Sequence, residues 1–228
     1  MIHLPEPDNY EDPIHYFRDS HKLIASVVDR FERELKKAKN DGIGCLLTPD
    51  SECHELLDFF VHVEPLHERD EERALFPIIA PKVPHTGFLS PGTPNRFMHE
   101  EHKVMQERAK ALLSMWKSMM MQPQARSAEE EARFIEVGET LVKLFREHIA
   151  KENAVIYSAA NDELLSPTER IAIMLMVKEH HGNQSIMPVL NFVDQPYGTM
   201  EETIDTSDAV SDQALDSEEE EEEESEDE

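Results

Sequence analysis

The stretch that decides the fold is HERDEERALFP at residues 67–77, together with its counterpart HIAKENAVIY at residues 148–157. Each opens with a histidine, and a glutamate follows four residues later, at Glu71 in the first stretch and at Glu152 in the second. In a helix, a spacing of four places both side chains on one face, with Cβ atoms about 5–6 Å apart. His21 and His102 each stand 46 residues ahead of one of these histidines. The pattern therefore occurs twice and indicates a repeated helical unit.

The starts of the helices are legible because a proline at the first helical position follows a capping residue four times. These pairs are Asp12-Pro13, Thr48-Pro49, Thr93-Pro94 and Ser166-Pro167. Ser127 with Glu130, and Ser166 with Glu169, have the spacing of capping boxes. The sequence predicts helices at 13–39, 50–78, 94–121, 128–160 and 167–181, and no strand pattern is apparent. We therefore expect an all-α protein, an up-down-up-down four-helix bundle with a short fifth helix.

Apolar residues recur on each long helix at alternating spacings of three and four, which is typical of a helix face that packs into a core. The first helix shows it plainly, with His21 set between Phe17 and Ile24. His67, His102 and His148 lie on the corresponding stripes of the other three helices. One such histidine is most simply a hydrogen-bonded core residue. Four of them, with two glutamates at ligand spacing, point to a polar centre inside the bundle.

A buried ionised carboxylate costs several kcal/mol unless it is paired or bound to a metal. No Lys or Arg shares the stripes of Glu71 and Glu152, so two metal ions would solve this problem. A mixed imidazole and carboxylate set without thiolates disfavours a closed structural zinc site and favours iron or manganese. The predicted ligands are His21, His67, Glu71, His102, His148 and Glu152, with the two glutamates as bridges. The alternative is a metal-free helical interaction module.

Other polar residues near the predicted site leave alternatives open. His99 and Glu68 are additional candidate ligands, although Glu68 and Glu101 are more simply supporting or surface groups. His62 is offset from the face of His67. The remaining histidines that we considered are expected at the surface, namely His15, His54, His85, His180 and His181.

The segments that carry these residues resemble hemerythrin and the HHE cation-binding family over roughly residues 13–160. The matching pieces are DSHKLI at 19–24, HERDEERALFP at 67–77, Glu101-His102, and HIAKENAVIY at 148–157. The resemblance implies a four-helix bundle that holds a non-haem di-iron centre with an oxo or hydroxo bridge.

The chain also departs from hemerythrin. In hemerythrin the third helix supplies two histidines four residues apart, and the fourth a histidine and an aspartate five apart. Here His99 and His102 are three apart, and His148 and Glu152 are four apart. These departures disfavour reversible oxygen carriage and favour a more open centre, as in bacterial hemerythrin-like proteins.

The sequence is therefore compatible with three functions. The first is a di-iron protein that binds or senses a small oxidant, which is dioxygen, peroxide or nitric oxide. The second is an enzyme that turns over peroxide or nitric oxide at the same centre, and the third is a protein that senses or buffers iron.

Charge and composition indicate the class of partner, the compartment and the domain limits. The net charge is −27, and residues 201–228 hold 16 acidic and no basic residues, which leaves −11 for residues 1–200. Such a surface repels phosphate backbones, so a nucleic-acid partner is not expected.

No signal peptide or membrane span is apparent, which favours the cytoplasm. Cys45 and Cys53 are read as ordinary reduced thiols. We expect one hemerythrin-like domain at 1–195 and a disordered acidic tail at 196–228, whose protein partner is unknown.

Overall fold

The computed structural model describes residues 1–82, 94–122, 126–160 and 164–182. Of residues 94–97 it describes the backbone alone. The described residues contain helices and no strands, so the all-α prediction is confirmed for them. The predicted disordered tail at 196–228, the cap at Thr93 and His85 lie outside the described residues. No helix in the described ranges is long and apolar enough to cross a membrane.

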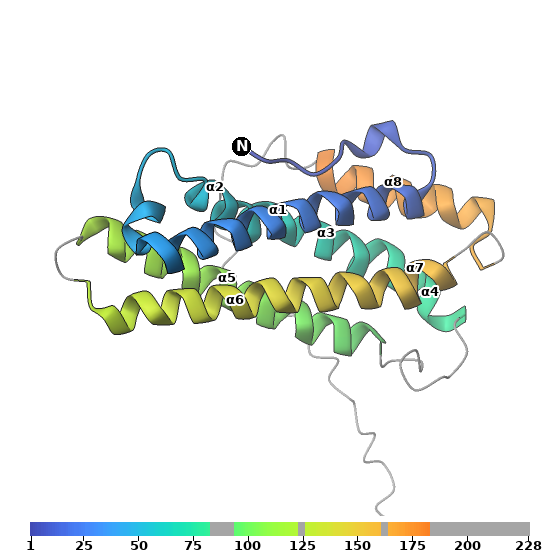
Figure 1. Ribbon diagram of the computed structural model, residues 1–228. Helices are drawn as coiled ribbons and strands as arrows, with labels where there is room; N and C mark the ends of the chain where they lie inside the picture. The colour runs from blue at the N-terminus through green and yellow to red at the C-terminus, as the bar shows by residue number, and fades with distance from the viewer. Residues whose placement is uncertain (83–93, 123–125, 161–163, 183–228) are drawn as a thin grey trace, which may run out of the picture. The chain divides into compact units, whose positions relative to one another are not determined.

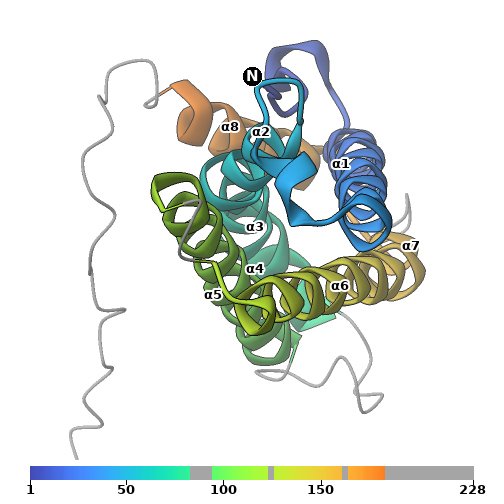
Figure 2. The same ribbon diagram turned by 60° about the vertical axis from the view of Figure 1, so that its left-hand side comes forward.

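Four helical rods make up the centre of the fold. The first is α1 (Pro13–Asp41) and the third is α5 (Pro94–Met121). The second consists of α2 (Cys53–Asp58), η3 (Phe59–Val63), α3 (Glu64–Asp70), η4 (Glu71–Leu75) and α4 (Phe76–Ile79). The fourth consists of α6 (Ala128–Lys151), η6 (Glu152–Ile156) and α7 (Tyr157–Ala159). Short 3-10 turns lie at Pro7–Asn9, Ile43–Leu47 and Ala80–Lys82, and α8 (Pro167–Gly182) follows the fourth rod. Figure 1 shows successive rods running in opposite directions, and Figure 2 shows them obliquely, arranged around a common interior.

Most helix ends follow from their capping residues. The Asp12 carboxylate accepts a hydrogen bond from the main-chain N–H of Ile14 (2.9 Å), and Gly42 ends α1 with a φ of +85° that favours glycine. Ser127 and Ser166 form the expected capping boxes. The prediction at Thr48 is wrong. The second rod begins at Cys53, because the Thr48 hydroxyl donates to the carbonyl of Cys45 and the Ser51 hydroxyl accepts the N–H of Cys53.

The apolar interior is divided into two clusters with the predicted polar centre between them. One cluster uses residues of α1 from Ile24 onward, of α5 from Met105 onward and of α6 up to Phe145. The other uses α1 up to Phe17 and the fourth rod from Ile156 onward, and it includes Met98 of α5 and three buried residues of α8. The positions between these limits are where His21, His102, His148 and Glu152 lie. The apolar stripes of the rods are therefore interrupted by polar side chains at the same level.

The fifth helix, α8, packs against the second rod at α3 and η4, and against α1 and the turn at Pro7–Asn9. Its last turn lies over Asp70, which is fully buried. This carboxylate accepts hydrogen bonds from Tyr16 (3.1 Å), His180 (2.8 Å) and His181 (2.8 Å). The prediction that His180 and His181 are surface residues is therefore wrong: both are half-buried, and they attach α8 to the residue that precedes Glu71.

Candidate metal centre

The structure brings all six predicted ligands together. The six residues form two groups of four side chains. Within each group, the possible ligand atoms all lie within 4.8 Å of one another. The first group adds His21 and His67 to the two glutamates, and the second adds His102 and His148 to the same two glutamates. We call these the His21 side and the His102 side of the centre. All six side chains are buried, and Glu71 and Glu152 have no exposed surface.

Local helix geometry positions the two shared glutamates. Glu71 and Glu152 are each the first residue of a π-helical turn, in which the main-chain N–H of Phe76 bonds to the carbonyl of Glu71 and that of Tyr157 to the carbonyl of Glu152. A π-turn adds one residue to a helix and is frequently found at functional sites. A third π-turn, Phe59–Val63, precedes His67 on the same rod as Glu71. Pro65 and Pro77 follow the two π-turns of this rod, where their missing N–H groups interrupt the regular hydrogen-bond ladder.

The two oxygens of each glutamate face different histidines. Oε1 of Glu71 lies 3.5 Å from Nε2 of His67 and 3.8 Å from that of His21, whereas Oε2 lies 3.7 Å from Nε2 of His102. A carboxylate placed in this way can bridge two cations. Oε2 of Glu152 lies 3.1 Å from Nε2 of His21 and 3.1 Å from Nε2 of His148, and its Oε1 lies 3.8 Å from Nε2 of His102. Glu152 therefore also faces both sides of the centre.

On the His102 side, the two imidazoles converge closely. Nε2 of His102 and Nε2 of His148 are 2.9 Å apart. Two ligands bound at right angles to one metal, each at about 2.1 Å, lie about 3 Å apart, which this separation matches. The geometry therefore fits a pair of adjacent ligands on one ion.

Outer partners fix the orientation of three of the four imidazoles. Nδ1 of His102 lies 2.8 Å from Glu72, Nδ1 of His148 lies 3.0 Å from Glu101, and Nδ1 of His21 lies 3.3 Å from the amide oxygen of Asn153. Since an oxygen acceptor holds the ring proton on Nδ1, the lone pair of each ring is left on Nε2, which points to the centre. These three rings are thus set in the tautomer that binds metal.

The buried charges and polar atoms of the centre also favour bound cations. Burial and the neighbouring Glu152 carboxylate raise the pKa of Glu71 well above its ordinary value, while burial and the neighbouring His21 hold the pKa of His67 well below its own. Both nitrogens of His67, both oxygens of Glu152 and Oε2 of Glu71 are buried without a hydrogen-bond partner. Unsatisfied buried polar atoms are costly, and five of the eight such side-chain atoms in the described residues belong to the proposed ligands. The residues present therefore fit two bound metal ions.

Three residues that sequence reasoning did not assign lie in direct contact with the predicted ligands. Glu72 and Asn153 orient His102 and His21 as described above. Tyr157 is fully buried, and its hydroxyl donates to Oε1 of Glu71 and lies 3.2 Å from Nε2 of His21. One signal was available for the orienting residues: Glu72, Glu101 and Asn153 are each the immediate chain neighbour of a predicted ligand.

The two additional candidate ligands lie outside both groups. Nδ1 of His99 is 3.0 Å from Glu72, and the side chain of His99 is 42% exposed. Glu68 is buried beside Glu64, and Oε1 of Glu68 has no hydrogen-bond partner. Burial raises the pKa of Glu64 to about 7, and Gln106 donates a hydrogen bond to it (3.2 Å). Glu64 and Glu68 form a buried acid pair next to the centre.

Three further histidines in the described residues lie away from both ligand groups. His15, His54 and His62 are exposed; His62 lies 3.5 Å from Asp58, and the His54 ring stacks on Trp116 with centroids 4.8 Å apart.

Comparison with known proteins gives one match. The family model described as Hemerythrin HHE cation binding domain matches residues 12–190. No curated protein matches the chain. No solved structure matches it either.

Proposed function

Because the chain belongs to the family of the hemerythrin HHE cation-binding domain, we propose that it is an up-down-up-down four-helix bundle that holds two iron ions. The proposed ligands are His21, His67, Glu71, His102, His148 and Glu152. In this proposal the centre binds or senses a small oxidant, which is dioxygen, peroxide or nitric oxide. Antiparallel helices that present Glu and His inward are the way in which di-iron carboxylate proteins are built.

One observation carries the proposal: the two ligand groups share Glu71 and Glu152. Sharing means that two cations would lie side by side with two carboxylates between them. Each cation would have two imidazoles of its own, and the two negative charges would be divided between the ions. A single ion would leave one histidine pair and several buried polar atoms without a partner.

The chain's own residues define what can reach such a centre. The apolar clusters on either side keep bulk water away, and Glu72, Glu101 and Asn153 hold three imidazoles in place. Bound iron would supply electrons and a position for an external ligand. The donor set is four nitrogen and two carboxylate ligands, which leaves room for such a ligand at two metal ions.

Anaerobic reconstitution with ferrous iron tests the proposal. We expect about two iron atoms per chain by elemental analysis, and a change in the optical spectrum on addition of air, peroxide or nitric oxide. One zinc per chain, or no metal at all, would contradict it. Iron that exchanges freely with solution and gives no response to the oxidants would favour iron buffering instead.

A second candidate is enzymatic turnover of peroxide or nitric oxide at the same centre. It is favoured by the protonatable groups that lie beside the ligands, namely Tyr157 on Glu71 and the acid pair Glu64 and Glu68. Such groups can hold and deliver protons to a bound ligand. Consumption of many equivalents of peroxide per chain, in the presence of an electron donor, would support this candidate. A single stoichiometric response would support binding or sensing.

A further inference from the structure

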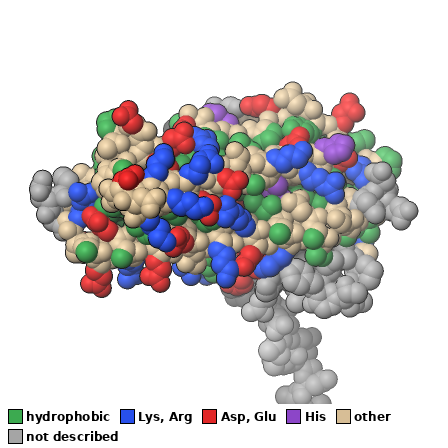
Figure 3. All heavy atoms as spheres, viewed as in Figure 1, with side chains coloured by type: hydrophobic (Ala, Val, Ile, Leu, Met, Phe, Trp, Pro, Cys, Tyr) green, Lys and Arg blue, Asp and Glu red, His purple; other side chains and the backbone are tan. Residues whose placement is uncertain are grey.

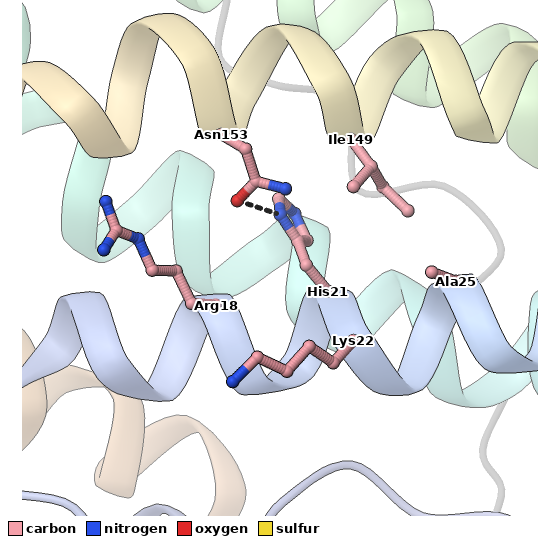
Figure 4. Close-up of a pocket in the computed structure, with 6 residues that line it drawn as sticks. All are labelled: Arg18, His21, Lys22, Ala25, Ile149 and Asn153. Atoms are coloured by element: carbon pink, nitrogen blue, oxygen red, sulfur yellow. Dashed lines mark hydrogen bonds between the residues drawn. The ribbon is translucent and has the colours of Figure 1, made fainter.

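A surface hollow of about 250 Å³ opens between α1 and the fourth rod, directly over the His21 side of the centre. We call it the α1–α6 hollow. Its lining consists of Arg18, His21, Lys22 and Ala25 from α1, with Ile149 and Asn153 from the fourth rod. Figure 4 shows His21 joined to Asn153 by a hydrogen bond, with Arg18 and Lys22 on the same helix as His21. The hollow therefore connects solvent with a predicted ligand.

The hollow is positively charged although the chain as a whole is acidic. Its two charged lining residues are Arg18 and Lys22, both exposed, and no carboxylate lines it. Within the described residues, the hydrogen bond that Arg18 makes is to the main-chain oxygen of Tyr157 (3.4 Å). Lys22 lies 2.6 Å from Asp19, whose carboxylate also accepts a hydrogen bond from Tyr10. Figure 3 shows further Lys and Arg side chains gathered across this face of α1 and α6.

The corresponding hollow on the His102 side differs in both size and charge. The α5–α6 hollow has a volume of about 60 Å³ and is lined by Glu101, Met105, Leu144, Glu147, His148 and Lys151. Glu101 pairs with Lys151 and with Nδ1 of His148, and Glu147 adds a second carboxylate. A small anion would meet repulsion there and attraction at the α1–α6 hollow.

We propose that the α1–α6 hollow is the port through which a small inorganic monoanion, of the size of azide or nitrite, reaches the His21 side. Arg18 and Lys22 attract the anion, and the Asn153 amide offers it a neutral hydrogen-bonding group beside His21. The port thus makes Arg18 and Lys22 determinants of ligand charge. This inference rests on the proposed function, because the anion would bind the metal held by His21 and His67.

The test uses the full-length, iron-loaded protein with azide as the probe. Iron content is measured first, and the association rate of azide then follows from stopped-flow absorbance. The double variant R18Q/K22Q should bind azide about tenfold more slowly at low salt, and the difference should shrink at high salt. Association of neutral nitric oxide should be unchanged. Because both side chains are exposed, the variant should fold as the wild type does.

Matched variants separate charge from structure. R33Q/K36Q removes the same charge from α1, at exposed positions about 16 Å or more along the helix from Lys22, and should leave the association rate of azide unchanged. Arg18→Lys keeps the charge, and its association rate for azide should stay close to that of the wild type. Ala25→Leu fills the hollow and should slow the association of both azide and nitric oxide.

The outcomes distinguish the two proposals. A chain that takes up no metal overturns the proposed function and the port with it. If the iron-loaded wild type and R18Q/K22Q bind azide at the same rate, the port alone is overturned. Equal slowing by R33Q/K36Q would also overturn it, since the effect would then come from the net charge of the chain.

Discussion

The two sides of the centre have the same ligands but different surroundings. On the His102 side, carboxylates of Glu72 and Glu101 hold both imidazoles, and the adjoining hollow is small and acidic. On the His21 side, a neutral amide holds His21, His67 has no hydrogen-bond partner, and the adjoining hollow is larger and basic. An imidazole that donates to a carboxylate is a stronger metal ligand. The repeat thus supplies two similar metal positions. We expect their neighbouring residues to make metal binding tighter on the His102 side and the metal more accessible on the His21 side.

Removal of a shared glutamate should have the largest effect, because it affects both sides at once. Glu71→Ala and Glu152→Ala should each weaken metal binding by more than about 100-fold, since loss of an outer partner alone costs about 10–100-fold. Metal content after purification from iron-replete cells measures this. His15→Ala is the control, because its side chain is 74% exposed. If one metal remained fully bound in Glu152→Ala, the bridging role of Glu152 would be wrong.

Removal of one histidine should separate the two sides. His21→Ala should retain metal on the His102 side, and His148→Ala should retain it on the His21 side. We expect the metal that remains in His21→Ala to be bound about tenfold more tightly, because of the carboxylate partners of the His102 side. Competition with a chelator gives both affinities. Equal affinities would show that the outer partners do not distinguish the sides.

Substitution of the residues that hydrogen-bond to the ligand histidines should change metal affinity less, and in opposite directions on the two sides. Glu101→Gln should weaken the His102 side, and Asn153→Asp should strengthen the His21 side, each by about tenfold at most. The same chelator competition measures the change, and circular dichroism verifies that the helices are retained. Should Asn153→Asp weaken binding, the amide would have a role other than that of a hydrogen-bond acceptor.

These comparisons also show what the sequence could and could not predict. The spacing of four between His67 and Glu71, and between His148 and Glu152, predicted the site together with the places of His21 and His102 on apolar stripes. The structure brings these six residues together. The three π-turns were not predicted, because one inserted residue leaves almost no trace in an apolar pattern. The hydrogen-bond partners of the ligand histidines lie on neighbouring rods. The apolar pattern of one helix does not show which residues of another helix it will face. The same limit hid the attachment of His180 and His181 to Asp70.

Truncation after Tyr197 should have the smallest effect, and it addresses whether the acidic segment influences either side. None of the six predicted ligands or their described hydrogen-bond partners lies in residues 198–228. Metal content, chelator affinity of both sides and helical content should therefore equal those of the full chain. A selective loss of metal from one side would show that the segment contributes to that side.

The π-turns at Glu71 and Glu152 make the centre sensitive to the length of the chain as well as to its side chains. Deletion of one residue from such a turn would restore a regular helix and relieve its geometry locally. It would leave the segments beyond it nearly in phase, because a π-turn holds one residue more than the corresponding turn of an α-helix. A deletion at a regular α-helical position of the fourth rod would instead rotate everything beyond it by about 100° and carry Tyr157 away from Glu71. The two turns therefore mark where the rods can lose one residue without losing their packing, at the cost of the local geometry that positions Glu71 and Glu152.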